Sequence, residues 1–321
     1  MSTTRRTWLQ SSASLLAVGT SGMLAQSLLG SAVTAPQTVR DRVSKIRYCL
    51  NMSTIQGDKV DIQEQVRIAA RAGYQGIELW LRDIQRFVDG GGKLADLRKQ
   101  IQDAGLQVES AIAFGQWIVD DEGARKKGLE QVAKDMDAVT ALGGHRIAAP
   151  PSGATNGPKL DLDHAADRYR ELLELGDRHD CVPQLEVWGF SKNLSHLKEV
   201  LYVTCGSNHP KACILPDVYH LYKGGSNFTE LGLLSGSRVH VFHMNDYPDT
   251  PPRDKINDAD RIYPTEGIAP IKTILSTMIQ NGFEGVLSLE LFNRGYWQQD
   301  PNVVAKTGLE KMKAAVALVA S

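Results

Sequence analysis

The feature that most constrains the fold is a regular alternation of short apolar runs with amphipathic stretches, from residue 46 to residue 320. Eight runs have the length and composition of buried strands, and a stretch with helical spacing follows each of them. Strands that are apolar along their length indicate a parallel sheet covered on both faces. Eight such units predict an α/β protein with the (β/α)8 TIM barrel fold. The predicted strands are 46–54, 76–80, 106–114, 145–151, 182–189, 212–218, 238–246 and 285–292.

An open, doubly wound sheet is the alternative fold for the same alternation. Such a sheet more often has a glycine-rich phosphate loop after its first strand, and LNMSTIQGDK (50–59) is not a loop of that kind. No linker-like composition interrupts residues 46–320. We therefore expect a single barrel domain over 46–321.

The N-terminal segment has the pattern of a twin-arginine export signal over residues 1–35. Arg5 and Arg6 come first, an acid-free and weakly apolar stretch follows, and small residues continue to Ala35. Glycine and serine interrupt the apolar stretch, which disfavours a permanent membrane anchor. The pattern predicts export to the periplasm or beyond, with the twin-arginine machinery as a partner.

Signal cleavage is expected after Ala32 or Ala35, although Pro36 disfavours the second site. Residues 36–45 would then link the signal to the barrel. Export implies an oxidising compartment. The four cysteines have no C-x-x-C spacing and are interpreted as core residues, with a disulfide left open.

The formal net charge of −1 argues against a nucleic-acid partner, because no basic run accompanies it. Hydrophobic residues make up 42% of the chain and charged residues 23%, which is typical of a soluble globular protein. The oligomeric state, including a homo-oligomer, is left open.

Four successive predicted strands end in a residue that can bind a metal ion. Active-site residues of TIM barrels lie at these C-terminal ends, and neighbouring strands are about 4.8 Å apart, so inward side chains can converge on one ion. Three carboxylates and one imidazole suit Mn²⁺, Mg²⁺ or Co²⁺ better than a thiolate-rich zinc site would, although Zn²⁺ or Fe²⁺ could bind. We predict one divalent ion, with Mn²⁺ favoured, at Glu186 (LEVWG), Asp217 (LPDVYH), His243 (VFHMND) and Glu290 (SLELFN).

The period of two along 238–246 separates the two histidines of that strand. His243 shares a face with Asn245, whereas His240 shares the opposite face with Phe242. If His243 lines the barrel, His240 faces the helices and has a structural role. Asn245 then has the phase of a residue that contacts substrate.

Two further residues lie at strand ends. Glu78 ends the second predicted strand and is either a substrate ligand or a bridge to a neighbouring loop. Trp188, together with Trp117 and Phe292, could form an apolar wall against a sugar ring, although core packing is the more common role of a single aromatic residue. No glycine-rich phosphate cradle is evident, so a phosphorylated substrate is not predicted.

With these residues placed, the chain resembles the xylose isomerase-like TIM-barrel superfamily over about 46–320. This superfamily includes sugar isomerases, ketose 3-epimerases, inosose dehydratases and endonuclease IV. Among its members, the chain is most similar to exported bacterial proteins described as sugar phosphate isomerase/epimerases. The motifs that carry the resemblance are GYQGIELW, LEVWG, PDVYH, VFHMND and LSLELFN.

The resemblance to ketose 3-epimerases implies one metal ion held by the four strand-end residues. It also implies that His220, three residues after Asp217, contacts the substrate. These enzymes use an arginine shortly after the metal-binding histidine, and Arg253 is the nearest downstream candidate here. Endonuclease IV has further histidine ligands on its second and third strands, and this chain has none at the matching places.

The resemblance implies an isomerase or epimerase of a sugar or keto-sugar. The metal ion would polarise a carbonyl, while Glu186 and Glu290 move a proton through an enediolate. Loss of a β-hydroxyl at the same site would make the protein a keto-sugar dehydratase. A barrel that binds a carbohydrate without converting it is the alternative from another functional class.

Overall fold

Parallel strands alternating with helices form a barrel, which confirms the predicted (β/α)8 TIM barrel fold. The computed structural model describes residues 38–56 and 60–320, and the predicted export signal lies outside the described residues. The strands are β1 (Arg47–Asn51), β2 (Gly76–Trp80), β3 (Gln107–Ile112), β4 (Arg146–Ala149), β5 (Val182–Glu186), β6 (Ile214–Leu215), β7 (Val241–Met244) and β8 (Val286–Leu289).

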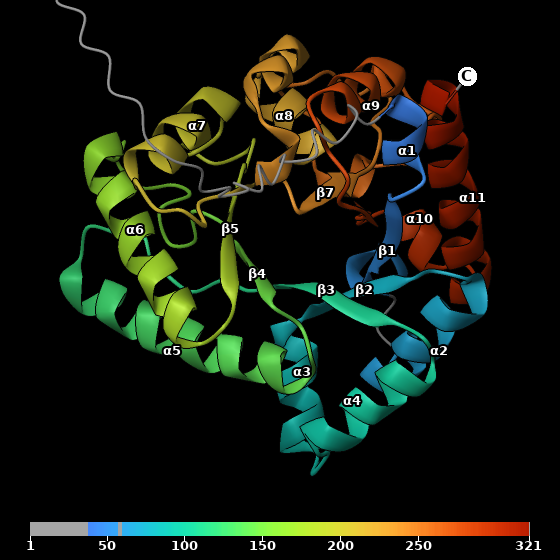
Figure 1. Cartoon of the computed structure of the whole chain (residues 1–321), viewed down its shortest axis with the longest axis horizontal. Helices are drawn as coiled ribbons and strands as arrows, with labels where there is room; N and C mark the ends of the chain where they lie inside the picture. Colours follow the sequence, from blue (N-terminus) through green and yellow to red (C-terminus); the bar gives the residue numbers. More distant parts are fainter. Residues whose placement is uncertain (1–37, 57–59, 321) are drawn as a thin grey trace, which may run out of the picture. The chain divides into compact units, whose positions relative to one another are not determined.

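Hydrogen-bonded ladders join the strands in two groups, in the orders β3-β2-β1-β8-β7 and β4-β5-β6. The groups meet just beyond β6, where Asp217 forms a parallel bridge with His243. The backbone N–H of His243 donates to the carbonyl of Pro216 over 2.9 Å at this junction. On the other side β3 lies against β4. Figure 1 shows the strands inside a layer of helices that includes α2, α4, α5, α6 and α11.

The helices that follow the strands form the outer layer, and short 3-10 helices occur in several connections. The α-helices are α1 (Val39–Val43), α2 (Ile62–Ala72), α3 (Leu81–Asp89), α4 (Leu94–Asp103), α5 (Glu122–Ala141), α6 (Leu162–Arg178), α7 (Leu197–Gly206), α8 (Val218–Gly224), α9 (Ile271–Gln280), α10 (Arg294–Trp297) and α11 (Pro301–Ala320). The 3-10 helices are η1 (Met52–Ile55), η2 (Phe228–Leu233), η3 (Gly236–Arg238) and η4 (Asp258–Asp260).

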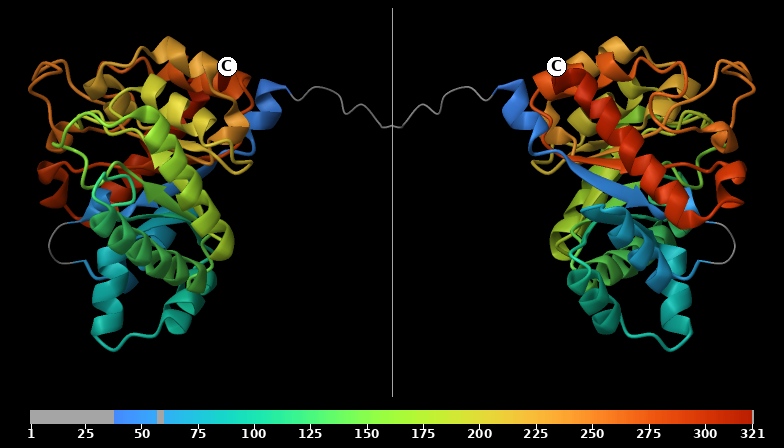
Figure 2. Two further views of the ribbon diagram at one scale, coloured as in Figure 1. Left: turned by 90° about the vertical axis from the view of Figure 1, so that its left-hand side faces the viewer. Right: turned by 90° about the vertical axis from the view of Figure 1, so that its right-hand side faces the viewer.

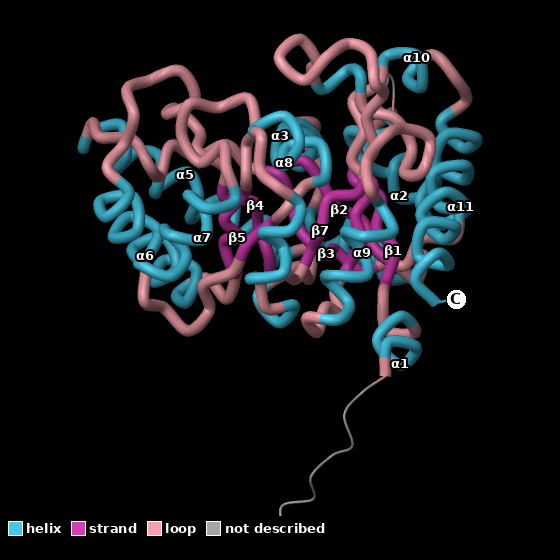
Figure 3. Tube along the Cα trace, turned by 90° about the horizontal axis from the view of Figure 1, so that it is seen from above, coloured by secondary structure: helices cyan, strands magenta, loops and turns pink. Residues whose placement is uncertain are grey.

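The long connections gather at the C-terminal ends of the strands. Figure 3 shows α1, which precedes β1, at one end of the barrel and α10, which follows β8, at the other. Figure 2 shows the orange connection between β7 and α9 on the side opposite the blue helix α1. This connection therefore covers the end of the barrel at which the predicted site residues lie.

Local sequence signals explain where several helices begin and end. The side chain of Asp61 caps α2 by accepting from the backbone N–H of Glu64 over 2.8 Å. Gly73 ends α2 with φ of 91°, a left-handed conformation that a glycine adopts without a steric penalty. Asp121 and Asp161 cap α5 and α6 in the same way as Asp61 caps α2.

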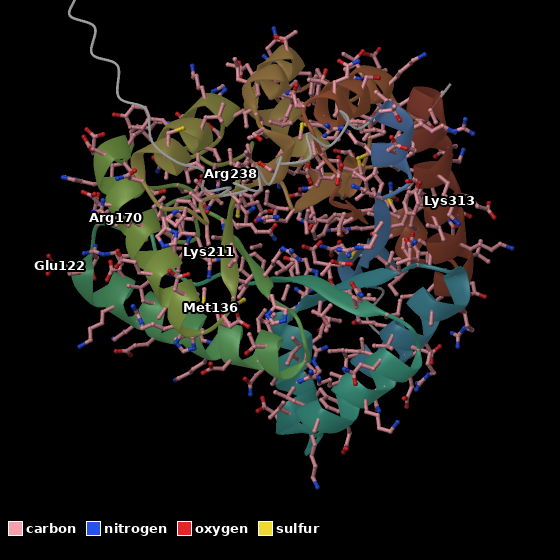
Figure 4. The ribbon with its side chains drawn as sticks, in the orientation of Figure 1. Glu122, Met136, Arg170, Lys211, Arg238 and Lys313 are labelled. Atoms are coloured by element: carbon pink, nitrogen blue, oxygen red, sulfur yellow. The ribbon has the colours of Figure 1, made fainter. Side chains whose placement is uncertain are left out.

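The period-two alternation places polar side chains inside the barrel and apolar ones against the helices. Ser288 pairs with His243 across β7 and β8, and both side chains are fully buried. Leu289, one residue further along β8, faces Gly308 of α11. Phe242 packs on Phe283 with ring centroids 6.5 Å apart, which puts it on the helix side as predicted. Side chains cross the space inside the strands in Figure 4.

Four segments differ from the sequence-based expectation. Two helices, α3 and α4, follow β2 where one helical stretch was expected, and the stretch expected after the sixth strand includes the 3-10 helix η2. The predicted sixth strand ends early, because Asp217 caps α8 instead of continuing the strand. Gly225 then ends α8 with φ of 85°. The segment 36–45, expected to be a linker, contains the five-residue helix α1.

The four cysteines are all free, and Cys49, Cys181 and Cys213 are buried. The disulfide that the sequence left open is not formed among them, and Cys205 is exposed instead of lying in the core. None of the helices in the described residues is both long and apolar enough to cross a bilayer.

Candidate metal centre

The imidazole of His243 lies at the centre of a cluster of buried carboxylates. Its Nε2 atom is 2.9 Å from Oε2 of Glu78. Its Nδ1 atom faces three other carboxylates, at 3.2 Å from Oε2 of Glu290, 3.7 Å from Oδ2 of Asp217 and 3.8 Å from Oε1 of Glu186. All five side chains are at most 3% exposed. The structure therefore brings together the four residues that the sequence predicted as metal ligands.

The geometry of this cluster fits a divalent cation. Nδ1 of His243 is buried and makes no hydrogen bond, although three carboxylate oxygens surround it. Ligand atoms of Glu186, His243 and Glu290 lie within 4.8 Å of one another. Ligands that each lie about 2.0–2.2 Å from one ion have roughly this separation. Asp217 offers a fourth oxygen on the same side of the ring.

The charges around His243 favour a cation next to Nδ1. Burial alone would lower the pKa of His243, but Glu290 and Glu78 outweigh burial and raise this pKa well above its usual value. A bound metal ion would take the place of the Nδ1 proton, because a metal ligand must be deprotonated.

Glu78 supports the imidazole from behind. Its Oε2 atom accepts hydrogen bonds from His243 Nε2, from Ser288 Oγ at 2.7 Å and from Asn51 Nδ2 at 2.9 Å. Because Nε2 is bound to Glu78, Nδ1 is the atom that remains for a metal ion. Of the two roles predicted for Glu78, the structure supports neither a substrate contact nor a loop bridge, since Glu78 orients His243.

Hydrogen bonds to both carboxylate oxygens hold Asp217 in place. Its Oδ1 atom accepts from the backbone N–H of His220 over 2.8 Å at the start of α8. Its Oδ2 atom accepts from Nδ2 of Asn245 over 2.9 Å, and Oδ1 of Asn245 accepts from the backbone N–H of Tyr219 over 2.8 Å. Asn245 is fully buried and both ends of its amide are bonded. It therefore positions Asp217, which corrects the predicted substrate contact.

Arg261 is a site residue that the sequence analysis missed. Its Nη1 atom donates to Asp217 Oδ2 over 2.9 Å and to Glu290 Oε2 over 2.8 Å. Its Nη2 atom lies 3.0 Å from His220 Nε2 and 2.5 Å from Asp258 Oδ1, and Nε donates to the same Asp258 oxygen over 3.1 Å. A guanidinium has five N–H donors, so all of them have partners within the protein.

The predicted arginine, Arg253, does not reach the site. Its side chain is exposed, and its backbone carbonyl accepts from Nζ of Lys223 over 3.1 Å. Arg253 and Arg261 lie in the same connection, which turns at η4 before it returns to the barrel. The sequence signal for that turn is the capping box of Asn257 and Asp260, directly before Arg261.

The paired glutamates differ in their affinity for a proton. Burial and the neighbouring carboxylates Glu290 and Asp217 raise the pKa of Glu186 well above its usual value. Burial would also raise the pKa of Glu290, but His243 and Arg261 outweigh it and lower this pKa. Without a bound cation, Glu186 therefore binds a proton more readily than Glu290 does.

A cavity of about 180 Å³ opens above the carboxylate cluster. Its polar side contains Glu186, Glu290, His220, Asp258 and Arg261, and its apolar side contains Ile112 and five aromatic residues: Trp80, Phe114, Trp188, Phe190 and Phe292. Trp188 thus lies in the wall, as predicted. Trp117 does not, because it is buried and its indole N–H donates to the carbonyl of Pro150 over 2.8 Å.

His220 presents a neutral ring to this cavity. Burial lowers the pKa of His220 to about 3. Arg261 can only donate, so Nε2 of His220 accepts and the proton stays on Nδ1. This buried N–H has no partner in the protein. His220 lines the cavity, and its predicted contact with substrate stays a prediction.

A family model described as "Xylose isomerase-like TIM barrel" matches residues 66–315. An inosose isomerase from Bacillus velezensis is 22% identical over 275 residues, which are 84% of this chain and 97% of that protein. A fructoselysine 3-epimerase from Escherichia coli O157:H7 is 23% identical, over 82% of this chain and 96% of that protein.

A 3-dehydroshikimate dehydratase from Pseudomonas putida is 22% identical over 78% of this chain, a match that covers 39% of that longer protein. Among solved structures, the IOLI protein with a bound zinc atom superposes with a TM-score of 0.78 at 20% identity, over 84% of this chain and 98% of that one. These relatives are enzymes of several reaction types on one fold.

Proposed function

The chain belongs to the xylose isomerase-like TIM barrel family, and we propose that it is a metal-dependent isomerase or epimerase of a sugar or keto-sugar. The observation that carries the proposal is the unpartnered Nδ1 of His243, which three buried carboxylates surround. Related isomerases and epimerases support the reaction class.

We assign the metal ion to Glu186, Asp217, His243 and Glu290. When bound, a divalent ion polarises a substrate carbonyl and makes the adjacent C–H more acidic. The carboxylate-rich ligand set favours Mn²⁺, and Zn²⁺ remains an alternative because a zinc atom is bound in the IOLI structure.

The proton transfer is assigned to the two glutamates. One glutamate takes the proton from one face of the substrate carbon, and the other returns a proton to the intermediate. Proton return to the opposite face of the same carbon gives an epimer, and return to the neighbouring carbon gives an isomer. The Nδ1–H of His220 orients the substrate by donating to one of its oxygens.

A dehydratase is the second candidate. One glutamate could remove the proton from carbon, and the other could give a proton to the leaving hydroxyl. The 3-dehydroshikimate dehydratase relative supports this alternative.

Incubation of the metal-loaded protein with ketoses and keto-sugars in D₂O separates the candidates. Deuterium in the recovered sugar supports an isomerase or epimerase, whereas loss of water with new enone absorbance supports the dehydratase. If neither occurs and Glu290→Gln binds sugar as the unmodified protein does, a carbohydrate-binding barrel replaces both.

We also propose export through the twin-arginine pathway, based on residues 1–35 of the sequence. Replacing both Arg5 and Arg6 by lysine should leave the protein in the cytoplasm of a bacterial host. Cell fractionation tests this, and unchanged export of the variant would contradict the proposal.

A further inference from the structure

The cavity above the carboxylates has a continuous aromatic wall. The ring centroid of Trp188 lies 6.0 Å from that of Phe114 and 5.0 Å from that of Phe190. Trp80 continues the wall, at 5.5 Å from Phe114 and 5.9 Å from Phe292. Four strand ends, those of β2, β3, β5 and β8, contribute these rings. The wall therefore includes residues from the C-terminal ends of four of the eight strands.

Two of these rings are exposed beside the cavity. The side chain of Phe114 is 47% exposed and that of Phe190 is 42% exposed. Trp80, in contrast, is buried, and its indole N–H donates to Oδ1 of Asn51 over 2.9 Å. Core packing explains Trp80, but it does not explain two exposed rings on either side of Trp188. An exposed apolar patch that continues a substrate cavity indicates an apolar group in the ligand.

The polar side of the cavity does not suit a phosphate group. Among the described residues that line it, the basic side chains are Arg261, whose five N–H donors are all bonded, and His220, whose Nε2 accepts a hydrogen bond from Arg261. Glu186, Glu290 and Asp258 make this side acidic. Apart from the proposed divalent ion, whose charge its own carboxylate ligands offset, none of these described residues would supply a free cation to balance a phosphate.

Nearby lysines do not supply that cation. Nζ of Lys223 donates to three backbone carbonyls, the closest being that of Ile256 at 2.7 Å. Nζ of Lys192 donates to the carbonyl of Asn156 over 3.2 Å. Neither side chain lines the cavity. The site is therefore built for an uncharged molecule.

We propose that the substrate is an uncharged glycoside of a keto-sugar, in which the sugar occupies the polar floor and a second ring packs against the wall formed by Phe114, Trp188 and Phe190. His220 lies at the boundary of the two parts, with its ring centroid 5.4 Å from that of Phe190 and with an unpartnered N–H. That N–H is a donor for the oxygen that joins the two rings. An aryl group and a second sugar both present a flat apolar face, so either can be the second ring. This inference rests on the proposed function.

Calorimetric binding to the metal-loaded protein tests the second ring. Matched pairs of methyl and 4-nitrophenyl glycosides of glucose, galactose, mannose and xylose contain no ketone, so binding is measured without turnover. In at least one pair, the 4-nitrophenyl glycoside should bind about ten-fold more tightly than its methyl partner. Cellobiose tests a sugar as the second ring, and glucose 6-phosphate should bind less tightly than glucose.

Variants locate the binding preference. Phe190→Ala and Phe114→Ala should each reduce the preference for the 4-nitrophenyl group to about three-fold or less. Phe190→Leu, which keeps an apolar side chain without a flat ring, should reduce it as well and guards against a folding defect in Phe190→Ala. Tyr202→Ala is the matched control, because Tyr202 on α7 is 48% exposed but does not line the cavity.

The inference is overturned if no 4-nitrophenyl glycoside and no disaccharide binds better than its one-ring partner, or if the phosphate ester binds best. A preference that survives in both phenylalanine variants also overturns it. Deuterium exchange on the same samples separates this result from the proposed function. Deuterium exchange without a preference for the second ring supports the proposed isomerase or epimerase and contradicts the glycoside substrate. A ring preference without exchange on any keto-sugar supports the ligand class and removes the isomerase.

Discussion

The two glutamates at the ends of β5 and β8, Glu186 and Glu290, are the residues assigned to proton transfer. We expect Glu186→Gln and Glu290→Gln each to lower the rate of deuterium exchange into substrate by about 10²- to 10⁴-fold, because an amide cannot carry the proton. Mass spectrometry of the recovered sugar measures this rate. Glu64→Gln is the control, since Glu64 lies on α2 and pairs there with exposed arginines. An exchange rate within two-fold of the unmodified protein in either site variant would remove that glutamate from the mechanism.

Glu78 affects the metal ion through His243 and without touching it. Glu78→Gln should weaken metal binding by about 10- to 100-fold, because the amide no longer selects the imidazole form that offers Nδ1 to the ion. Titration calorimetry with Mn²⁺ and with Zn²⁺ measures the affinity. Glu109→Gln is the matched control, because Glu109 is also buried inside the barrel but binds Arg47. Equal losses in the two variants would indicate a general loss of structure.

Prediction from sequence succeeds for side chains whose direction follows from the strand period. Glu186, His243 and Glu290 lie at strand ends, so a period of two places them inside the barrel. The same rule was insufficient for Asn245, because its phase is correct but its hydrogen bonds are made to Asp217 and Tyr219. Arg261 could not be predicted by this rule, since an irregular connection and not a strand brings it to the site.

At the scale of elements, the connection between β7 and α9 depends on one carboxylate. The Oδ1 atom of Asp246 accepts from the backbone N–H groups of Tyr247 and Ala269, and Oδ2 accepts from those of Thr265 and Gly267, all within 3.0 Å. Asp246 is therefore a clamp that closes both ends of the connection. This role explains the direction of its side chain.

Removal of this clamp should loosen the element that carries Arg261. We expect Asp246→Ala to lower the free energy of unfolding by about 3 kcal/mol, because several buried N–H groups lose a charged acceptor. Chemical denaturation measures the change, and limited proteolysis should cut the connection faster. Asp249→Ala, in the same connection, should leave both nearly unchanged. If Asp246→Ala is as stable as Asp249→Ala, the clamp has no energetic importance.

At the scale of the whole molecule, metal binding and folding are linked. An ion that binds the folded chain at 1,000 times its dissociation constant raises the free energy of unfolding by about 4 kcal/mol. We expect Mn²⁺ or Zn²⁺ to raise the melting temperature and a chelator to lower it. His243→Ala and Asp217→Ala should abolish the rise. His209→Ala is the control, because His209 pairs with Asp177 near the surface. A rise that persists in His243→Ala would place the ion elsewhere.

The pH dependence of the whole fold provides a test of the strand phase. Burial, followed by Arg146 and Arg238, lowers the pKa of His240 to about 4. An unfolded chain binds this proton already below about pH 6.5, whereas the folded chain binds it only near pH 4. Stability should therefore fall between about pH 6.5 and pH 4 and change little further below, since both states are then protonated.

Partial exposure of His240 reduces this loss to about 1–2 kcal/mol. Other groups titrate in the same range. The test therefore compares the free energy of unfolding of the unmodified protein with that of His240→Gln, measured by chemical denaturation at several pH values. Glutamine cannot gain this proton. Between pH 6.5 and pH 4 the variant should therefore lose about 1–2 kcal/mol less stability than the unmodified protein does. If the two proteins lose equal stability over this range, His240 is as well solvated in the folded chain as in the unfolded one. That result would contradict its partly buried position.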